Sequence, residues 1–408
     1  MYDTDIRLSV PFVNDTYFIN ALTELADSAK GSRTTIFEVY GALPNDPVGN
    51  LRPPATVRPM DKAQLAERIA EFHRHGIKFN YVMNSELLPI PLTEEYIDTL
   101  IGFIQELCDA GIDEITVTIP YVIGLIKRHF PKLKVNASIC NEIASVREAV
   151  EFEELGADVI VLDRDANRDF PLLRDIRRSI KGGIKVLCNS ACVFNCINVH
   201  YHGTYSSALS NSMLGISEEG KTSFKAPYCA FYCRRRFFDD PAELIKMHWI
   251  RPEDMPLYAD EGINLFKIDG RDKTPDYLLA VVKAYLNGSF SGNFFHLLQP
   301  EFCEDIFEIQ NAPDGLYSDG EDTDTLDKQT DAFLAESEKW LVGIRNSDLD
   351  GFAEAFASEK IVCRGNCGKC GYCEKIAKKI EISPEWQQRM IRTMDHNLDR
   401  YFKAGNKE

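Results

Sequence analysis

The feature that most constrains the fold is a regular alternation of strand-like and helix-like segments up to about residue 290. The strand-like runs cover 6–13, 35–39, 78–83, 114–119, 134–139, 158–162, 184–187 and 263–268. Helical patterns separate or follow them at 15–29, 62–75, 93–110, 121–130, 146–155, 170–180 and 275–286. Strands joined by crossover helices run parallel. Eight such units predict an α/β fold with a closed (β/α)₈, TIM-barrel-like domain, and an open doubly wound sheet is the alternative.

The rest of the chain predicts a second part. We expect the barrel over residues 1–300, with a cysteine-rich stretch inserted at 188–236. Residues 301–328 are expected to form an acidic linker, because 311–327 reads NAPDGLYSDGEDTDTLD. Residues 329–408 are expected to form a helical extension with its own cysteine motif. Helices are predicted there over 330–342, 349–358 and 384–402.

Cysteine usage indicates metal binding. The chain has 12 cysteines in 408 residues, most of them clustered. Its first residues, MYDTDIRLSV, are acidic where a secretion signal would be basic, and no apolar run is long enough to span a bilayer. These features predict a cytoplasmic protein without membrane association. Clustered cysteines in a reducing compartment favour metal sites over disulfides.

The first cysteine group lies in the stretch after the seventh predicted strand. Cys192 and Cys196 are four residues apart, and so are Cys229 and Cys233. Residues four apart share a helical face, so each pair can direct two thiols to one point. Four thiolates suit an iron–sulfur cluster or a structural zinc. Cys188 is the reserve ligand, or a strand-end thiol lining the pocket. The alternative is that these are buried small hydrophobic residues.

The second cysteine group lies in the extension. Cys363, Cys367, Cys370 and Cys373 form C-x3-C-x2-C-x2-C with glycines between them. The close spacing predicts a second 4Fe–4S cluster that serves as an electron relay, and zinc is the alternative metal. The first three cysteines also match the C-x3-C-x2-C pattern of radical S-adenosylmethionine enzymes, so that class of enzyme stays open.

Polar residues at the ends of the predicted strands give candidate catalytic positions, because barrel chemistry lies at the carboxyl ends of the strands. The candidates are Arg164, Lys267, Asp269 and Arg271. Fixed cations suit an anionic substrate, while the alternative is a salt-bridge network with the neighbouring aspartates. His200, in the cysteine stretch, is a candidate metal ligand or proton donor.

Charge narrows the class of partner. The formal net charge of −17 argues against non-specific binding to nucleic acid, which needs a basic surface. We therefore expect a small-molecule or peptide substrate and an electron-donor protein as partners. The sequence leaves the oligomeric state open.

Several of these stretches resemble the peptidase U-32, or collagenase-like, family. FKIDGRDK at 266–273, followed by Pro275 and Tyr277, is similar to the family's K-I-E-G-R-x-K element, with Asp269 in place of Glu. KLKVNASICNEI resembles a family strand that ends in S-T-Q-x-N, and VIVLDRDAN resembles one with an R-E pair. YCAFYCR resembles the family's C-x-x-x-C-R. The first cysteines, C-x3-C-x3-C, are closer together than the family's C-x6-C.

This resemblance implies a 4Fe–4S cluster on four cysteines and an oxygen-independent hydroxylation, with prephenate as a possible oxygen source. The resulting prediction is an iron–sulfur hydroxylase or related enzyme. A zinc-stabilised peptidase or binding module is a further alternative. The chain contains neither HExxH nor G-x-S-x-G, which disfavours a peptidase.

Overall fold

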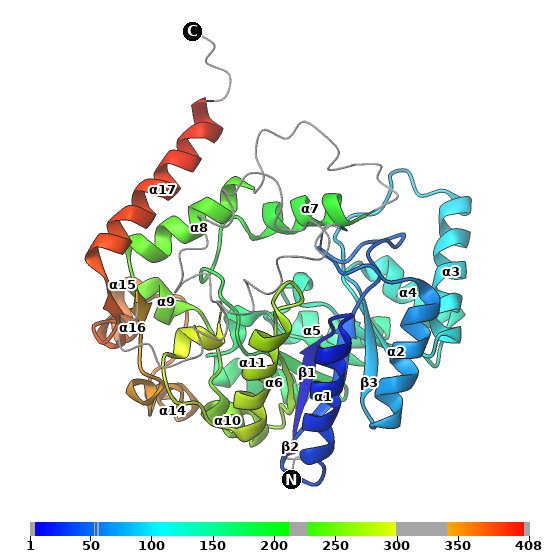
Figure 1. Cartoon of the computed structure of the whole chain (residues 1–408), viewed down its shortest axis with the longest axis horizontal. Coiled ribbons are helices and arrows are strands. Elements are labelled where there is room, and N and C mark those ends of the chain that lie inside the picture. The colour runs from blue at the N-terminus through cyan, green and yellow to red at the C-terminus, as the bar shows by residue number, and fades with distance from the viewer. Residues whose placement is uncertain (1–4, 53, 55–56, 212–226, 299–340, 404–408) are drawn as a thin grey trace.

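The computed structural model of the chain describes residues 5–52, 54, 57–211, 227–298 and 341–403. Eight parallel strands close into a barrel in chain order, and β8 pairs with β1 (Figure 1). The strands are β1 (Ile6–Pro11), β2 (Thr34–Gly41), β3 (Lys78–Met83), β4 (Glu114–Val117), β5 (Lys134–Ala137), β6 (Val159–Val161), β7 (Gly183–Leu187) and β8 (Leu265–Lys267). The predicted closed barrel is confirmed, and the open sheet is excluded.

Helices surround the barrel, and all but the short α10 follow the predicted segments. They are α1 (Thr16–Ser28), α2 (Lys62–Arg74), α3 (Glu94–Asp109), α4 (Pro120–His129), α5 (Val146–Leu155), α6 (Phe170–Ser179), α10 (Met255–Ala259) and α11 (Pro275–Asn287). In α2 the apolar residues Leu65, Ile69 and Phe72 are buried against the strands. Asp61 caps its first turn in a capping box with Gln64, which satisfies backbone N–H groups that the helix leaves open.

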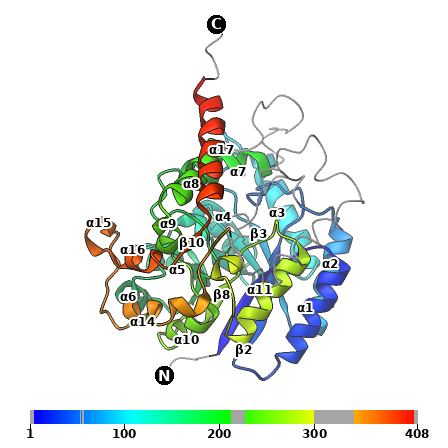
Figure 2. The ribbon, with the colours of Figure 1, turned by 60° about the vertical axis from the view of Figure 1, so that its left-hand side comes forward.

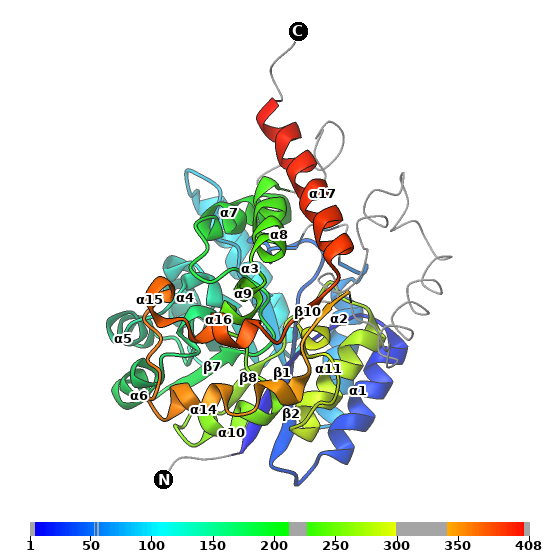
Figure 3. The same ribbon diagram turned by 90° about the vertical axis from the view of Figure 1, so that its left-hand side faces the viewer.

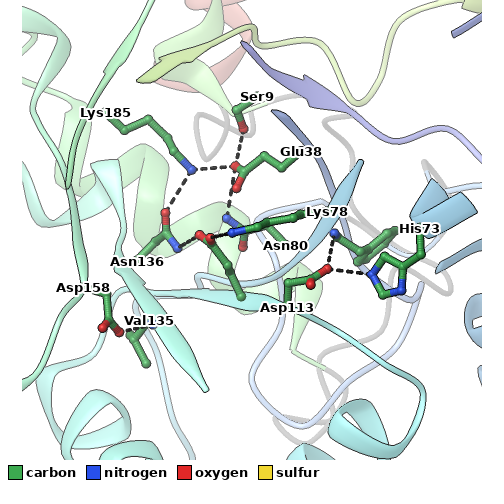
Figure 4. A network of polar contacts seen from close by, with 12 residues as sticks. Ser9, Glu38, His73, Lys78, Asn80, Asp113, Val135, Asn136, Asp158 and Lys185 are labelled. Carbon is green, nitrogen blue, oxygen red and sulfur yellow. Dashed lines mark hydrogen bonds and ion pairs between the residues drawn. The ribbon is translucent and has the colours of Figure 1, made fainter. Parts of the chain in front are cut away.

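The barrel interior is polar at mid-height (Figure 4). Lys185 of β7 pairs with Glu38 of β2 at 2.5 Å, and both side chains are fully buried. Lys185 also donates to Oδ1 of Asn136, while Ser9 and Asn80 donate to Glu38. These bonds satisfy most of the polar groups that the narrow interior removes from water.

Further helices cover the carboxyl end of the barrel. α7 (Val199–Ser210) and α8 (Tyr228–Asp239) lie across this end in Figure 1, and α9 (Ala242–Lys246) follows α8. The stretch before α7 forms a loop. Asn195 has a φ of 49°, which turns the chain between Cys192 and Cys196. The shared helical face predicted for these two cysteines is therefore wrong, whereas Cys229 and Cys233 do share helix α8.

The C-terminal part runs along the flank of the barrel and then up beside α8 (Figures 2 and 3). Its elements are η8 (Asn346–Leu349), α14 (Phe352–Ala357), α15 (Cys367–Cys370), α16 (Tyr372–Ala377), α17 (Pro384–Lys403) and an antiparallel pair, β9 (Val342–Gly343) and β10 (Glu381–Ile382). Trp386 of α17 packs edge-on against Phe238 of α8, with ring centroids 5.1 Å apart. The predicted linker at 301–328 lies outside the described residues, as does 330–340 of the predicted helix 330–342.

None of the helices in the described ranges is both long and apolar enough to cross a membrane.

Candidate active site at the barrel mouth

A pocket of about 440 Å³ opens at the carboxyl end of the barrel. Loops after the strands form its floor, and α7 and α8 form one wall. Four of the five predicted catalytic residues line it, namely Arg164, Lys267, Asp269 and Arg271. The first cysteine group also lines it, namely Cys192, Cys196, Cys229 and Cys233. The fold thus brings two groups that are distant in sequence to one cavity.

Three of the cations that line the pocket have no carboxylate partner among the described residues, whereas Arg52 pairs with Asp269 and Asp272. Within the described parts of the chain, neither Arg164, Lys267 nor Arg271 forms an ion pair with a carboxylate. The Lys267 ammonium lies 4.1 Å from the Tyr40 ring centroid, and Arg271 donates to the carbonyl of Asn50 at 2.7 Å. The buried Nε of Arg164 has no hydrogen-bond partner there. The predicted alternative of a salt-bridge network with the aspartates is therefore not formed.

The neighbouring aspartates are engaged elsewhere. Asp163 accepts the backbone N–H of Asp165, and Asp165 accepts the N–H of Asn195 at 2.8 Å. Asp269 meets Arg52, 3.9 Å away. Burial lowers the pKa of Lys267 to about 8. The charges of Arg271 and Lys185 also lower this pKa, whereas the charge of Asp269 raises it. The pocket therefore keeps three cations available for an anionic ligand.

Two of the pocket cysteines, Cys229 and Cys233, have thiols that burial keeps protonated. Burial raises the pKa of Cys229 to about 11 and that of Cys233 to about 12, and a charge on the neighbouring thiols would raise them further. A thiolate here needs a cation to stabilise it, as a bound metal does. The donor set fits a cluster or zinc in kind and number. However, no three His, Cys, Asp or Glu side chains of the described residues are gathered closely enough to hold a metal ion.

Cys188 and His200 lie apart from the pocket lining. Cys188 is fully buried at the end of β7, and its backbone N–H donates to the Lys267 carbonyl. The His200 side chain is 84% exposed and faces Glu142 at 3.6 Å. Cys188 and His200 therefore do not form a nucleophile pair with each other. His202, which lies on α7 shortly after the cysteine loop, lines the cavity instead.

Sequence reasoning missed several lining residues, among them Arg52, Glu86 and Cys140. Arg52 and Glu86 come from loops after β2 and β3 that contain no recognisable motif. Burial, followed by the charge of Glu142, raises the pKa of Glu86 to about 7. A carboxyl group with that pKa can exchange a proton near neutral pH. Cys140 lies in the S-x-x-N stretch at 138–141. Only the position of this stretch after a predicted strand indicated that it could line the pocket.

The second cysteine group lies on the flank, beside the barrel cysteine loop. Cys363 Sγ is 3.6 Å from His248 Nε2, and Arg168 Nη1 is 3.8 Å from Cys373 Sγ. His248 stacks on Phe194, which lies between Cys192 and Cys196, at 4.3 Å. The two cysteine groups therefore approach each other at the stacked rings of Phe194 and His248.

This barrel with its thiol-lined mouth belongs to a known class. The model of peptidase family U32 matches residues 32–289, and the chain is a member of that family. The match ends before the second cysteine group, so that group lies outside the part that the family model describes.

Relatives within the family have different names. A protein of Methanocaldococcus jannaschii called "Uncharacterized protease MJ1657" is 25% identical over 88% of this chain and 93% of its own length. The "Collagenase" of Porphyromonas gingivalis is 30% identical over 35% of this chain and 38% of its own. The "23S rRNA 5-hydroxycytidine C2501 synthase" of Escherichia coli is 23% identical over 54% of this chain and 32% of its own. The solved structure of the U32 peptidase Mk0906 covers 65% of this chain and 93% of its own length, with 15% identity and a TM-score of 0.48.

Proposed function

We propose that this protein is an iron–sulfur redox enzyme that modifies an anionic organic substrate in the barrel mouth, by oxygen-independent hydroxylation or a related reaction. The observation that carries the proposal is the composition of the pocket, which is lined by four cysteines and by three cations that form no ion pair with a carboxylate of the described residues. The relative whose name describes hydroxycytidine synthesis supports this type of reaction.

Each side of the pocket has its own role in this proposal. Arg164, Lys267 and Arg271 bind and orient the carboxylate or phosphate of the substrate, because fixed cations with several donors suit such groups. Glu86, with its pKa of about 7, accepts or returns a proton. Cys192, Cys196, Cys229 and Cys233 would hold a 4Fe–4S cluster, which supplies one-electron transfer beside the substrate.

The C-terminal cysteines would hold a second metal centre that connects the pocket to a redox partner protein. Hydroxylation with water as the oxygen source releases two electrons and two protons, so these electrons would leave the pocket toward an electron acceptor. The stacked rings of Phe194 and His248 lie between the two cysteine groups and offer the electrons a path to the flank. A small molecule or a peptide remains the expected substrate, since the net charge of −17 disfavours a long RNA. The rRNA-modifying relative makes RNA the competing substrate class.

The test compares cells that contain the wild-type protein with cells that contain Cys229→Ser, grown without oxygen. Small molecules and RNA nucleosides are compared by mass spectrometry. We expect a compound that is one oxygen atom heavier than its precursor, present with the wild type and absent with Cys229→Ser. Cys108→Ser, a change of a cysteine on α3 outside the pocket, must keep the compound. If both variants and the wild type give the same compounds, the proposed reaction is wrong.

A further inference from the structure

A buried arginine without a carboxylate partner faces the second cysteine group. Arg168 is 3% exposed, and in the described parts of the chain no carboxylate pairs with it. Its Nη1 donates to the carbonyl of Ile245 at 2.6 Å, and its Nη2 donates to that of Met247 at 2.5 Å. These are neutral acceptors. Among the described residues this buried guanidinium therefore has hydrogen bonds but no carboxylate in contact, and the carboxylate whose charge acts on it, Asp254, is paired with Arg251. Such a group is costly unless a further anion lies nearby.

Aromatic rings fix the guanidinium in place. Its central carbon lies 4.7 Å from the ring centroids of both Trp249 and Phe352, and 5.6 Å from that of Phe356. Phe352 stacks in turn on Tyr372, which directly precedes Cys373. Arg168 comes from the loop after β6, whereas two of these rings come from α14 of the extension. The barrel thus provides the cation and the extension helps to enclose it.

The groups that can supply the missing negative charge are thiols. Nη1 of Arg168 lies 3.8 Å from Cys373 Sγ, and Cys363 is the other cysteine whose charge acts on Arg168. A free thiol carries no charge, whereas a thiolate that binds a metal does. A metal ion bound by four thiolates carries a net negative charge, since a divalent ion or an oxidised 4Fe–4S core offsets only two of the four charges.

A second barrel side chain reaches the same cysteines. His248 is buried, and its Nδ1 must donate to the carbonyl of Asp165 at 2.7 Å, because a carbonyl oxygen can only accept. This bond orients the ring and directs Nε2 at Cys363 Sγ, 3.6 Å away. Metal-site histidines and their neighbours are commonly held in this way by a backbone carbonyl. Gly365, at φ +68°, lies against the barrel loop that holds Asn195. A Cβ at this glycine would be 3.1 Å from Asn195 Nδ2.

We propose that Cys363, Cys367, Cys370 and Cys373, which are not gathered closely enough to hold a metal ion in this structure, close around a metal to form an anionic four-thiolate site that is completed by the barrel, with Arg168 as its buried counter-charge. This inference deepens the proposed function, because it concerns the site that would carry electrons between the pocket and the redox partner. The site is then part of the folded whole and does not form on an independent C-terminal module.

The experiment isolates this site from the barrel group. In the full chain with Cys229→Ser and Cys233→Ser, Co²⁺ is titrated without oxygen, and its sulfur-to-cobalt absorption reports binding by thiolates. We expect Arg168→Met to weaken Co²⁺ binding about 10- to 100-fold, as the loss of groups surrounding a metal site commonly does. Arg168→Lys keeps the charge but not the planar fork, so its affinity for Co²⁺ should lie between that of the parent chain and that of Arg168→Met.

Two controls separate charge from packing. Arg174→Met removes an arginine that reaches the extension at Ala357 and Glu359 but has carboxylate partners, and it should bind Co²⁺ like the parent. Phe356→Leu loosens the aromatic surroundings of Arg168 without removing charge, and it should bind Co²⁺ within about twofold of the parent. If Arg168→Met fails to fold, the Co²⁺ affinities of Arg168→Lys and Phe356→Leu are compared. A larger loss for Arg168→Lys than for Phe356→Leu then still assigns the effect to the guanidinium, and equal losses assign it to packing.

The inference is overturned if the Arg168 variants bind Co²⁺ as tightly as Arg174→Met, or if the isolated site takes up no Co²⁺. In a second variant, Cys367→Ser and Cys373→Ser remove the C-terminal site and leave the barrel cysteines intact. This variant is purified without oxygen and its iron content is measured. Absence of iron there would contradict the proposed function while leaving the C-terminal site unaffected, so the two failures are distinguishable.

Discussion

At the scale of single residues, the pocket is marked by cations that form no ion pair with a carboxylate of the described residues. Arg164 and Lys267 would each gain an ion pair if a nearby aspartate turned toward them, yet the aspartates cap loops or meet Arg52 instead. Keeping a desolvated cation unpaired costs stability, and functional sites are where proteins commonly carry such a cost. The arrangement therefore points to an anionic ligand.

Lys267 should make anion binding depend on pH. Its pKa is lowered to about 8, so the side chain is a cation below that pH and neutral above it. Affinity for a dicarboxylate probe such as malonate should therefore fall as pH rises through about 8. Isothermal titration at a series of pH values measures this. Lys267→Arg keeps its charge throughout, so its affinity should stay level over the same range; a parallel fall in both proteins would assign the titration to another group.

Arg164 should contribute to binding and little to stability. Because it has no ion pair to lose, Arg164→Met should weaken malonate binding roughly 10- to 100-fold, the worth of a charge-assisted hydrogen bond of about 1.5–3 kcal/mol. The free energy of unfolding should change by less than about 1 kcal/mol. Arg58→Met, which removes a surface arginine paired with Asp15, serves as the matched control and should leave binding unchanged. Equal affinities for the two variants would remove Arg164 from the site.

At the scale of elements, the strands carry polar residues into the barrel where many barrels are packed with branched apolar ones. Glu38 and Lys185 come from β2 and β7, which are not neighbours in the sheet, so their ion pair spans the interior. Asn136 and Asn80 complete the hydrogen bonds around it (Figure 4). This network fixes the height at which the pocket floor begins.

Breaking this pair should be costly. Lys185→Met leaves the Glu38 carboxylate buried without a counter-charge, which should lower the free energy of unfolding by about 3–5 kcal/mol. Adding Glu38→Leu should restore most of the loss, because an apolar pair replaces the ionic one. Urea unfolding measures both variants. Lys127→Met, which breaks a partly exposed pair with Asp158, should lose about 1 kcal/mol or less. A loss of that small size for Lys185→Met would contradict the structural role of the pair.

The alternation of strands and helices was sufficient to predict the barrel, because buried parallel strands and amphipathic helices each leave a local pattern. The predicted 78–83 and 146–155 match β3 and α5 residue for residue. Helix α7 was missed because its sequence, VHYHGTYSSALS, is polar and lacks a periodic apolar face. Arg52 lies at the pocket because the loop after β2 carries it there, and the course of such a loop leaves no pattern in the sequence.

At the scale of the whole molecule, the C-terminal part supports the wall of the pocket. α17 runs beside α8, which carries Cys229 and Cys233 (Figure 3). Trp386 is 3% exposed and packs on Phe238 of that helix. The extension therefore acts on the barrel site through α8 as well as through the Phe194–His248 contact.

Removing this support should affect both stability and metal retention. Trp386→Ala should lower the free energy of unfolding by about 3–5 kcal/mol, as expected for a large buried aromatic residue. Because α8 then loosens, iron should leave the barrel cysteines faster in the presence of a chelator. Phe402→Ala changes a residue on the same helix that is 77% exposed, and it should leave both quantities unchanged. If Trp386→Ala destabilises the protein but releases iron at the wild-type rate, α17 does not support the cysteine wall.

The account as a whole depends on what the two cysteine groups bind. The most direct measurement is the iron, sulfide and zinc content of protein purified without oxygen, together with its absorption spectrum. The account predicts about eight iron and eight sulfide per chain, with a broad brown absorption, because two 4Fe–4S clusters would fill both groups. A colourless protein that contains zinc and no iron would contradict the redox function and leave only the barrel fold and the family membership in place.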